Sequence, residues 1–278
     1  MKVTVVVDNS VPISAKSPFL AVHGYSLLIE HDTKKILFDM GQSQAVVNNL
    51  SVLGTSPTEL DALVLSHGHW DHSGGLMHVM KHRHKRLPLY AHSDIFIPRF
   101  SIAGGSRQFA GIPYQKEQLT TLGIDWQLGE TPREMFPRLW FSGQIPRITD
   151  YEHGDDKLVI GCDDGCDCQD GIDDDVALYY IQDGDLVVIG GCTHSGLVNT
   201  VKYGLKVTGA KRLRGWIGGT HLGPVAKEQQ EKTLTFIEQM QPEFIMSAHC
   251  TGFDMMAELR TRFGSRFIPA IVSTVVEF

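Results

Sequence analysis

The chain has 278 residues, of which 42% are hydrophobic and 21% charged, an ordinary composition for a globular protein. Its formal net charge of −7 argues against a general nucleic-acid surface, so a long nucleic acid is not expected as substrate. The chain holds no apolar run of membrane-spanning length, and its first residues read straight into a strand, so we expect no membrane contact. Five cysteines, an odd number, favour a reducing cytoplasm.

The first half of the chain predicts antiparallel strands followed by strand–helix alternation. A β-branched strand over 3–7 comes first, and a loop over 11–24, which contains two prolines, is expected to lie over a site. Apolar alternation predicts a hairpin from strands at 26–30 and 35–40. The elements expected next are a helix over 46–53, a strand over 61–65, a helix over 76–82 and a strand over 87–92.

The middle of the chain is the least regular part. Residues 98–155 predict an insertion or lid beside the site, with one strand at 139–141. Residues 161–175 are acidic, glycine-rich and cysteine-rich, and predict a loop.

The second half again begins with two strands and then alternates. The expected elements are strands at 176–181 and 186–189, a helix beginning at 197, a strand ending at 217, a helix over 226–240, a strand at 244–246, a helix over 253–263 and a closing strand over 268–278. Two halves of this kind predict a single domain over 1–278 with an α/β, four-layer αββα sandwich.

The most informative motif follows the strand at 61–65 and reads His67-x-His69-x-Asp71-His72. Imidazole and carboxylate groups suit zinc, iron or manganese. His67 and His69 alternate and can converge on one metal, whereas Asp71 and His72 follow where the chain turns and can face a second ion. The motif therefore predicts two divalent metal ions, with zinc preferred.

Three further strand-end loops carry histidine, and ligands gather at strand ends in sheets flanked by helices. We expect His194 to join His67 and His69 on the first ion, and His249 to join Asp71 and His72 on the second. Cys192 lies two residues before His194, so its thiolate is a candidate ligand or bridge, with a small buried residue as the alternative. His221 is a candidate general acid or phosphate contact rather than a ligand, although a ligand role stays open.

Two other groups carry less specific signals. Cys162, Cys166 and Cys168 are one thiolate short of a closed zinc site, so free thiols in an acidic loop are the alternative to metal binding. Asp39 ends a strand and is expected either to hydrogen-bond a ligand imidazole or to be an ordinary turn carboxylate.

The motif at 67–72 resembles the signature of the metallo-β-lactamase superfamily. Other segments resemble a narrower branch, labelled dihydropterin ribofuranosylaminobenzene phosphate synthase-like metal-dependent hydrolases. They are Asp8-Asn9, 38–41, 142–147, Asp174-Asp175, 191–196, 219–222 and 247–252. Most members of the superfamily have a Gly-Asp that supplies a bridging carboxylate where this chain has Gly191-Cys192. The resemblance therefore implies a bridge that is absent, or replaced by thiolate or water. From its place in the order of the motifs along the chain, His221 resembles a histidine that assists phosphodiester cleavage in tRNA-processing relatives.

These patterns predict a cytoplasmic hydrolase in which metal-bound hydroxide attacks a phosphodiester or other ester-like bond of a small molecule, with a phosphate-bearing molecule among the candidates. Asp71 is expected to orient the attacking water as well as to bind metal, which with His221 gives the expected catalytic pair. Two alternatives stay open at this point: a di-iron redox enzyme, and a non-catalytic protein that binds its ligand through the metal.

Overall fold

The computed structural model describes residues 1–14, 16–83, 85–161 and 166–278. It divides into two compact units. Unit 1 comprises residues 1–129, 160–167 and 271–278, and unit 2 comprises residues 130–159 and 168–270. The prediction of one domain over the whole chain stays a prediction. Within the described residues, none of the helices combines the length and apolarity needed to cross a bilayer.

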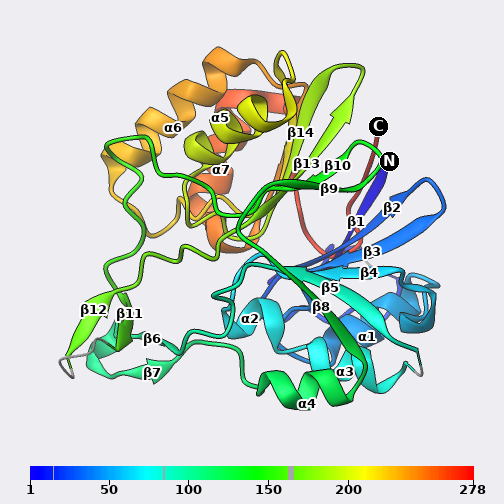
Figure 1. Cartoon of the computed structure of the whole chain (residues 1–278). Helices are drawn as coiled ribbons and strands as arrows, with labels where there is room; N and C mark the ends of the chain where they lie inside the picture. The colour runs from blue at the N-terminus through cyan, green and yellow to red at the C-terminus, as the bar shows by residue number, and fades with distance from the viewer. Residues whose placement is uncertain (15, 84, 162–165) are drawn as a thin grey trace. The chain divides into compact units, whose positions relative to one another are not determined.

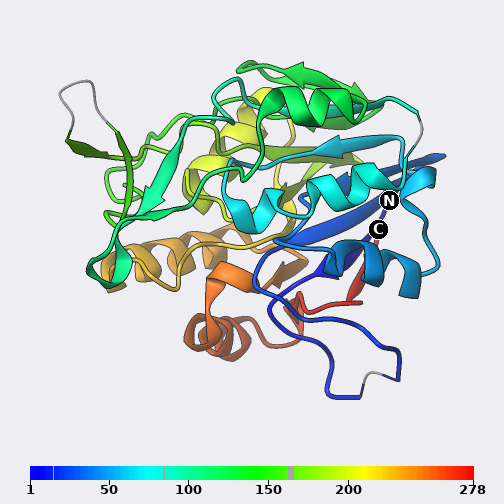
Figure 2. The same ribbon diagram turned by 90° about the horizontal axis from the view of Figure 1, so that it is seen from below.

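Unit 1 is built on a sheet that, among the described residues, has seven strands in the order β18-β1-β2-β3-β4-β5-β8. Their bounds are β1 (Lys2–Val7), β2 (Ser26–His31), β3 (Lys34–Phe38), β4 (Ala62–Val64), β5 (Leu87–Ala91), β8 (Ile124–Leu128) and β18 (Val275–Glu277). Strands β1, β2 and β3 pair antiparallel, whereas β3, β4, β5 and β8 are parallel. Both termini lie in this unit, because β18 pairs with β1 (Figure 2).

The helices of unit 1 are α1 (Ala45–Val52), α2 (Trp70–Ser73), α3 (Leu76–Lys81) and α4 (Lys116–Thr121). The first core of the chain forms where apolar side chains of α1 and α3, such as Leu50 and Leu76, pack against sheet residues such as Leu37 and Leu63, all of them fully buried. The unit also holds a short antiparallel pair, β6 (Arg99–Ser101) with β7 (Gln108–Phe109), and the 3-10 turns η1 (Pro57–Glu59) and η2 (Ala103–Gly105).

Unit 2 repeats this plan with a sheet of seven strands, among the described residues, in the order β17-β16-β15-β14-β13-β10-β9. The bounds are β9 (Arg133–Phe136), β10 (Leu139–Phe141), β13 (Ala177–Gln182), β14 (Asp185–Gly190), β15 (Leu213–Ile217), β16 (Phe244–Ser247) and β17 (Phe267–Pro269). Antiparallel pairing joins β9, β10, β13 and β14, and β14 to β17 are parallel.

Three longer helices belong to unit 2: α5 (Leu197–Thr208), α6 (Lys227–Met240) and α7 (Phe253–Phe263) (Figure 1). Their apolar residues, including Val201, Leu234 and Leu259, share a core with Val188 and Trp216 of the sheet. The 3-10 turns η3 (His249–Thr251) and η4 (Gly264–Arg266) flank α7. The strands β11 (Leu158–Gly161) and β12 (Asp167–Gln169) each contain one of the points where the chain passes between the units.

Two predictions about secondary structure need correction. The closing strand predicted over 268–278 is two strands in different units, β17 and β18. Pro269 ends β17, because proline has no amide hydrogen to donate to a sheet. The segment 98–155 is also more regular than predicted, since α4 and β8 complete the parallel edge of the first sheet. Among the five residues of β8, Ile124 alone is fully buried, so this strand lacks the apolar pattern that reveals a strand in the sequence.

Candidate metal centre

The metal-binding motif of unit 1 lies where two parallel strands end. Phe38 of β3 pairs with Val64 of β4, so the residues that follow each strand emerge side by side. Asp39 therefore lies next to the segment that leads to His67, and its amide donates to the carbonyl of Val64 at 2.8 Å. The motif then turns into the short helix α2, which carries Asp71 and His72.

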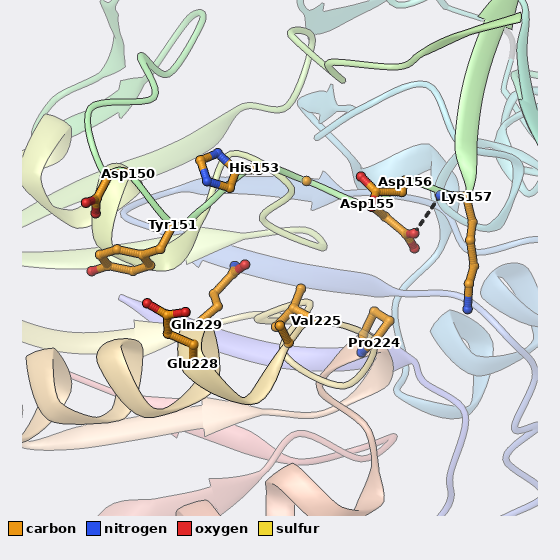
Figure 3. A pocket seen from close by; sticks show the side chains of 12 residues that line it. Asp150, Tyr151, His153, Asp155, Asp156, Lys157, Pro224, Val225, Glu228 and Gln229 are labelled. Atoms are coloured by element: carbon orange, nitrogen blue, oxygen red, sulfur yellow. Dashed lines mark hydrogen bonds between the residues drawn. The ribbon is translucent and has the colours of Figure 1, made fainter.

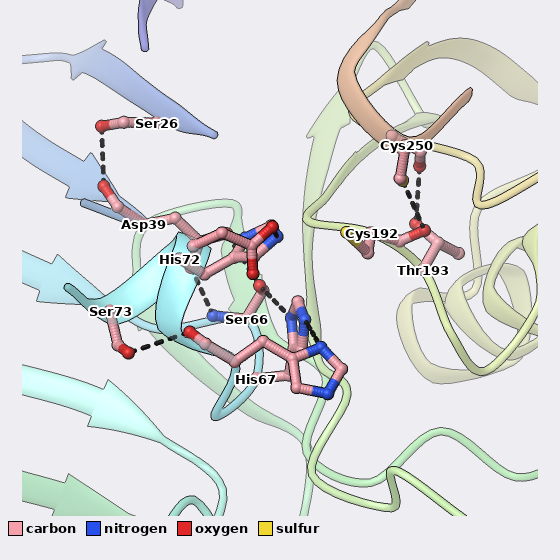
Figure 4. A network of polar contacts seen from close by, with 12 residues as sticks. Ser26, Asp39, Ser66, His67, His72, Ser73, Cys192, Thr193 and Cys250 are labelled. Atoms are coloured by element: carbon pink, nitrogen blue, oxygen red, sulfur yellow. Dashed lines mark hydrogen bonds and ion pairs between the residues drawn. The ribbon is translucent and has the colours of Figure 1, made fainter. Parts of the chain in front are cut away.

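Asp39 is the centre of a buried hydrogen-bond network (Figure 4). Its Oδ1 accepts from the amide of Ser66 at 2.8 Å, and its Oδ2 accepts from the Ser66 hydroxyl at 2.7 Å. Oδ2 also lies 2.7 Å from Nδ1 of His72, and neither side chain is exposed. The prediction that Asp39 hydrogen-bonds an imidazole of the motif is thus confirmed.

This network sets the tautomers of two imidazoles. A carboxylate only accepts, so Nδ1 of His72 must donate to Asp39. The Ser66 hydroxyl donates its hydrogen to Asp39, so its oxygen accepts from Nδ1 of His67 at 2.8 Å. Both rings therefore carry their lone pair on Nε2. A histidine held in this way by a carboxylate, directly or through a hydroxyl, is the usual arrangement behind a metal.

The remaining members of the motif converge on the same place. Nε2 of His67 lies 2.9 Å from Nδ1 of His69, and the rings of His67 and His72 are 4.2 Å apart. Oδ2 of Asp71 lies 3.7 Å from Nε2 of His72. Burial, followed by the neighbouring His72 and His69, lowers the pKa of His67 well below its ordinary value. A neutral imidazole is the form that binds metal.

Unit 1 adds one residue that sequence reasoning missed. Nε2 of His23, in the loop over 11–24, lies 3.3 Å from Oδ2 of Asp71. The loop reaches this point because Gly24 has a φ of +130° and a Cβ there would lie 2.3 Å from the carbonyl of Asp71. The one signal in the sequence was a Pro-rich loop ending in His-Gly. His92, which also follows a strand, accepts instead from the amide of Asp94 at 3.1 Å, as in a turn.

In unit 2 the predicted residues lie at the ends of three parallel strands. Cys192 and His194 follow β14, His221 follows β15, and His249 follows β16. The loops are joined by hydrogen bonds. The amide of Gly219 donates to the carbonyl of Gly191 at 2.8 Å, and the hydroxyl of Thr193 donates to the carbonyl of Gly219 at 2.9 Å.

Two charged residues fix the loop that carries His194. Arg147 donates to the carbonyl of His194 at 3.0 Å. The amide of Ser195 donates to Oδ2 of Asp175 at 2.9 Å. Burial raises the pKa of Asp175, although hydrogen bonds from Ser195 oppose this effect. Arg147 and Asp175 belong to two of the segments that resemble the narrower branch, and their contacts give those segments a physical role.

His221 lies in a polar and partly charged environment. Its ring is 4.2 Å from that of His194, and its Nε2 is 3.6 Å from Oδ2 of Asp155. Burial lowers the pKa of His221, but interactions with Asp155 and Cys250 outweigh burial and raise it to about 9. The imidazole is therefore protonated at neutral pH in the protein without metal. Asp155 and Cys250 were not predicted as its partners.

Asp155 also lines a pocket of about 380 Å³ (Figure 3). Its lining includes the carboxylates of Asp150, Asp155, Asp156 and Glu228 and the cation of Lys157. Carboxylates outnumber cations here, so the pocket disfavours an anionic ligand. We therefore do not assign it to a phosphate group.

The predicted metal ligands of unit 1, His67, His69, Asp71 and His72, thus lie close together, and those of unit 2, Cys192, His194 and His249, lie in loops that follow parallel strands. Their division between two ions stays a prediction. Within unit 1, buried imidazoles with fixed tautomers and a carboxylate are a donor set that fits a divalent metal.

The acidic loop is only partly described. Cys162 lies outside the described residues, Cys166 is exposed, and Cys168 is disulfide-bonded. The alternative of free thiols is therefore wrong for Cys168, and a disulfide-bonded sulfur is also not a thiolate ligand.

Comparisons with known proteins agree with this fold. The family model described as the metallo-beta-lactamase superfamily matches residues 20–158. A Methanocaldococcus jannaschii protein named 7,8-dihydropterin-6-methyl-4-(beta-D-ribofuranosyl)-aminobenzene-5'-phosphate synthase is 30% identical, over 94% of this chain and 92% of its own length. A second, uncharacterised protein of that organism is 32% identical, over 92% of this chain and 93% of its own.

Solved structures show the same fold. Tm1679, described as a metal-dependent hydrolase of the beta-lactamase superfamily, has a TM-score of 0.82 at 22% identity, with 100% of this chain and 99% of that chain covered. A diphosphatase from the PhnP family has a TM-score of 0.53 at 13% identity, with 100% and 97% covered. The predicted α/β fold class and the resemblance to the dihydropterin synthase-like branch are confirmed. The chain belongs to the metallo-β-lactamase superfamily.

Proposed function

We propose that this protein is a metal-dependent hydrolase that cleaves a phosphodiester or another ester-like bond of a small, phosphate-bearing molecule. The observation that carries the proposal is the network around Asp39, which fixes two buried imidazoles with their Nε2 lone pairs beside His69 and Asp71. Such fixed tautomers serve a metal better than they serve packing, because a buried imidazole without a role is costly to desolvate.

Divalent metals bound to such residues supply activated water at neutral pH and polarise an ester oxygen. The other roles in the proposed reaction belong to residues of the chain itself. Asp71 is held by the backbone of α2 and lies beside His72 and His23, so it is placed to orient an attacking water. In the protein without metal, Asp155 and Cys250 raise the pKa of His221 to about 9, and a protonated His221 suits contact with a phosphate oxygen or proton donation to a leaving group.

Support for a phosphate-bearing substrate comes from two sources. One is the cationic form of His221. The other is the full-length relative whose name includes a ribofuranosyl 5'-phosphate. That relative is named a synthase, so formation of a bond to a ribosyl phosphate is a second candidate function for this chain.

The test compares wild type with Asp71→Asn, loaded with zinc or with manganese, on three classes of substrate: an aryl phosphodiester, an aryl phosphomonoester and an aryl carboxylic ester. We expect phosphodiester hydrolysis by the wild type and a loss of about 100-fold or more in the variant. His78→Ala removes an imidazole of α3 outside the motif and is the matched control.

A wild type that is no faster than Asp71→Asn on all three classes would reject hydrolysis and favour the synthase or the binding protein. Activity confined to the carboxylic ester would keep the hydrolase and reject the phosphate-bearing substrate. Stoichiometric iron with redox turnover and no hydrolysis would instead support the di-iron alternative.

A further inference from the structure

Unit 2 contains a second group of metal-binding side chains that the proposed hydrolysis does not use as a set. The side chains of Cys192, His221 and Cys250 each offer one ligand atom, and these atoms all lie within 4.8 Å of one another. They come from the loops after three neighbouring parallel strands, β14, β15 and β16. Two sulfurs and an imidazole so close together are a softer donor set than the imidazoles and carboxylate of unit 1.

The two thiols meet because the middle loop has no side chain between them. A Cβ at Gly219 would lie 2.5 Å from Sγ of Cys250 and 3.4 Å from Cα of Cys192. Cys250 therefore reaches over the end of β15, where its thiol donates to the carbonyl of Cys192 at 3.6 Å (Figure 4). The amide of His221 donates to the same sulfur at 3.3 Å.

The backbone around this group is strained and firmly held. Thr193, His221 and His249 have φ angles of 63°, 48° and 54°, which residues other than glycine rarely adopt. The Thr251 hydroxyl holds two loops together, because it accepts from the amide of Thr220 at 3.2 Å and lies 2.7 Å from the Ser247 hydroxyl. Strain kept in place by such bonds is typical of functional sites.

The orientation of His221 also suits a ligand. Its Nε2 faces Oδ2 of Asp155 at 3.6 Å. A carboxylate behind one ring nitrogen leaves the other nitrogen, Nδ1, for a metal. Asp155 thus faces one ring nitrogen of His221, as Asp39 faces one ring nitrogen of His72 in unit 1, although at 3.6 Å rather than at the hydrogen-bond distance of 2.7 Å.

We propose that Cys192, Cys250 and His221 form a zinc site within unit 2, with Asp155 as a positioning residue behind His221. Two thiolates and one imidazole, with a fourth position open to water, are an established zinc ligand set. The proposal goes beyond the proposed hydrolysis and does not depend on it. It gives Cys250, which has no role in the proposed hydrolysis, the role of a zinc ligand. It also makes His221 a ligand whenever zinc occupies this site in unit 2.

The first experiment uses cobalt in place of zinc. The full-length protein is stripped with a chelator and titrated with Co²⁺, while the near-ultraviolet charge-transfer band, which arises only when sulfur binds cobalt, is recorded. We expect the band in wild type and in the control Cys166→Ser, which removes the exposed sulfur of the acidic loop. Cys250→Ser should lose about half of the intensity, because one of two sulfur ligands is gone. The Cys192→Ser/Cys250→Ser double variant should lose all of it.

A full band in Cys250→Ser would overturn the proposal, because Cys192 alone would then account for it. The variant Asp71→Asn separates this site from the hydrolase. The proposal requires the band to persist in Asp71→Asn whatever happens to hydrolysis, and loss of the band there would also overturn it.

A second measurement needs no variant and so does not depend on folding. Wild-type protein is alkylated with and without zinc, and the labelled cysteines are mapped by mass spectrometry. Zinc should slow labelling of Cys250 at least about 10-fold and leave Cys166 unchanged. Equal labelling of Cys250 with and without zinc, or a Cys192–Cys250 disulfide that forms equally fast in the presence of zinc, would reject the site.

Discussion

Nδ1 of His72 lies 2.7 Å from Oδ2 of Asp39, with both side chains fully buried. The same carboxylate receives the hydroxyl of Ser66, which in turn accepts from His67. One aspartate that we do not count among the metal ligands therefore sets the proton positions of two residues that we do.

We expect Asp39→Asn to weaken metal binding by about 10–100-fold. The carboxylate of Asp39 can only accept a hydrogen bond, so Nδ1 of His72 must donate, whereas the amide of asparagine can also donate one. The tautomer of His72 is then no longer fixed. Competition with a chromophoric chelator measures the affinity. Asp94→Asn, an exposed carboxylate of the same unit, is the control. Unchanged affinity in Asp39→Asn would show that the network serves packing alone.

Gly24→Ala should destabilise the loop that carries His23. A Cβ there would lie 2.3 Å from the carbonyl of Asp71, so either the loop or Asp71 must move, at a cost of about 3 kcal/mol. Gly54→Ala, also at a positive φ (+75°), has nothing within 4 Å of the new Cβ, so it should cost only about 1–2 kcal/mol. Chemical denaturation measures both. Equal losses would mean that backbone strain, and not the contact with Asp71, fixes Gly24.

Glu152 should make unfolding depend on pH. It is buried, and its Oε1 and Oε2 accept from the amides of Val198 and Asn199, both at 2.9 Å, at the beginning of α5. Burial raises its pKa above the ordinary value of 4.5 and outweighs these hydrogen bonds. The folded state then binds more protons than the unfolded state, so the contribution of Glu152 to stability is greatest below pH 4.5 and decreases as the pH rises through its raised pKa.

Glu152→Gln removes the titration while keeping the shape of the side chain. We expect its deficit in the free energy of unfolding, relative to wild type, to shrink between acidic and neutral pH. Glu117→Gln, at an exposed position of α4, should show no such trend. A deficit that grows with pH would mean that the helix amides favour the carboxylate more than burial opposes it.

Arg147→Lys tests whether two hydrogen bonds donated in different directions by one guanidinium group are needed to hold His194. Arg147 donates to the carbonyl of His194 and, at 3.3 Å, to Asp173, and lysine is unable to reproduce both directions. If His194 is a ligand, metal affinity should fall by roughly 10-fold in the chelator assay. Arg86→Lys, an exposed arginine of unit 1, controls for the change of cation. An affinity equal to wild type would argue against His194 as a ligand.

The sequence by itself predicted the elements with strong apolar patterns and the residues at their ends. Buried strands such as β1, β4 and β14 and the helix α6 were predicted close to their observed bounds, because period and turn signals are local properties. The motif at 67–72 was equally local, since its four side chains lie within six residues. The edge strand β8, half-buried, and the division of the last segment into β17 and β18 left no such local signal.

Only the tertiary structure decided which side chains meet. Asp39 and His72 are separated by 33 residues, and Cys192 and Cys250 by 58. In each unit the residues come together because parallel strands deliver their following loops to one edge of a sheet. The sequence pattern shows that a loop follows a strand. It does not show that Gly219 opens a path between two sulfurs, or that Asp39 sets the tautomers of two imidazoles, because both depend on the order of strands across the sheet.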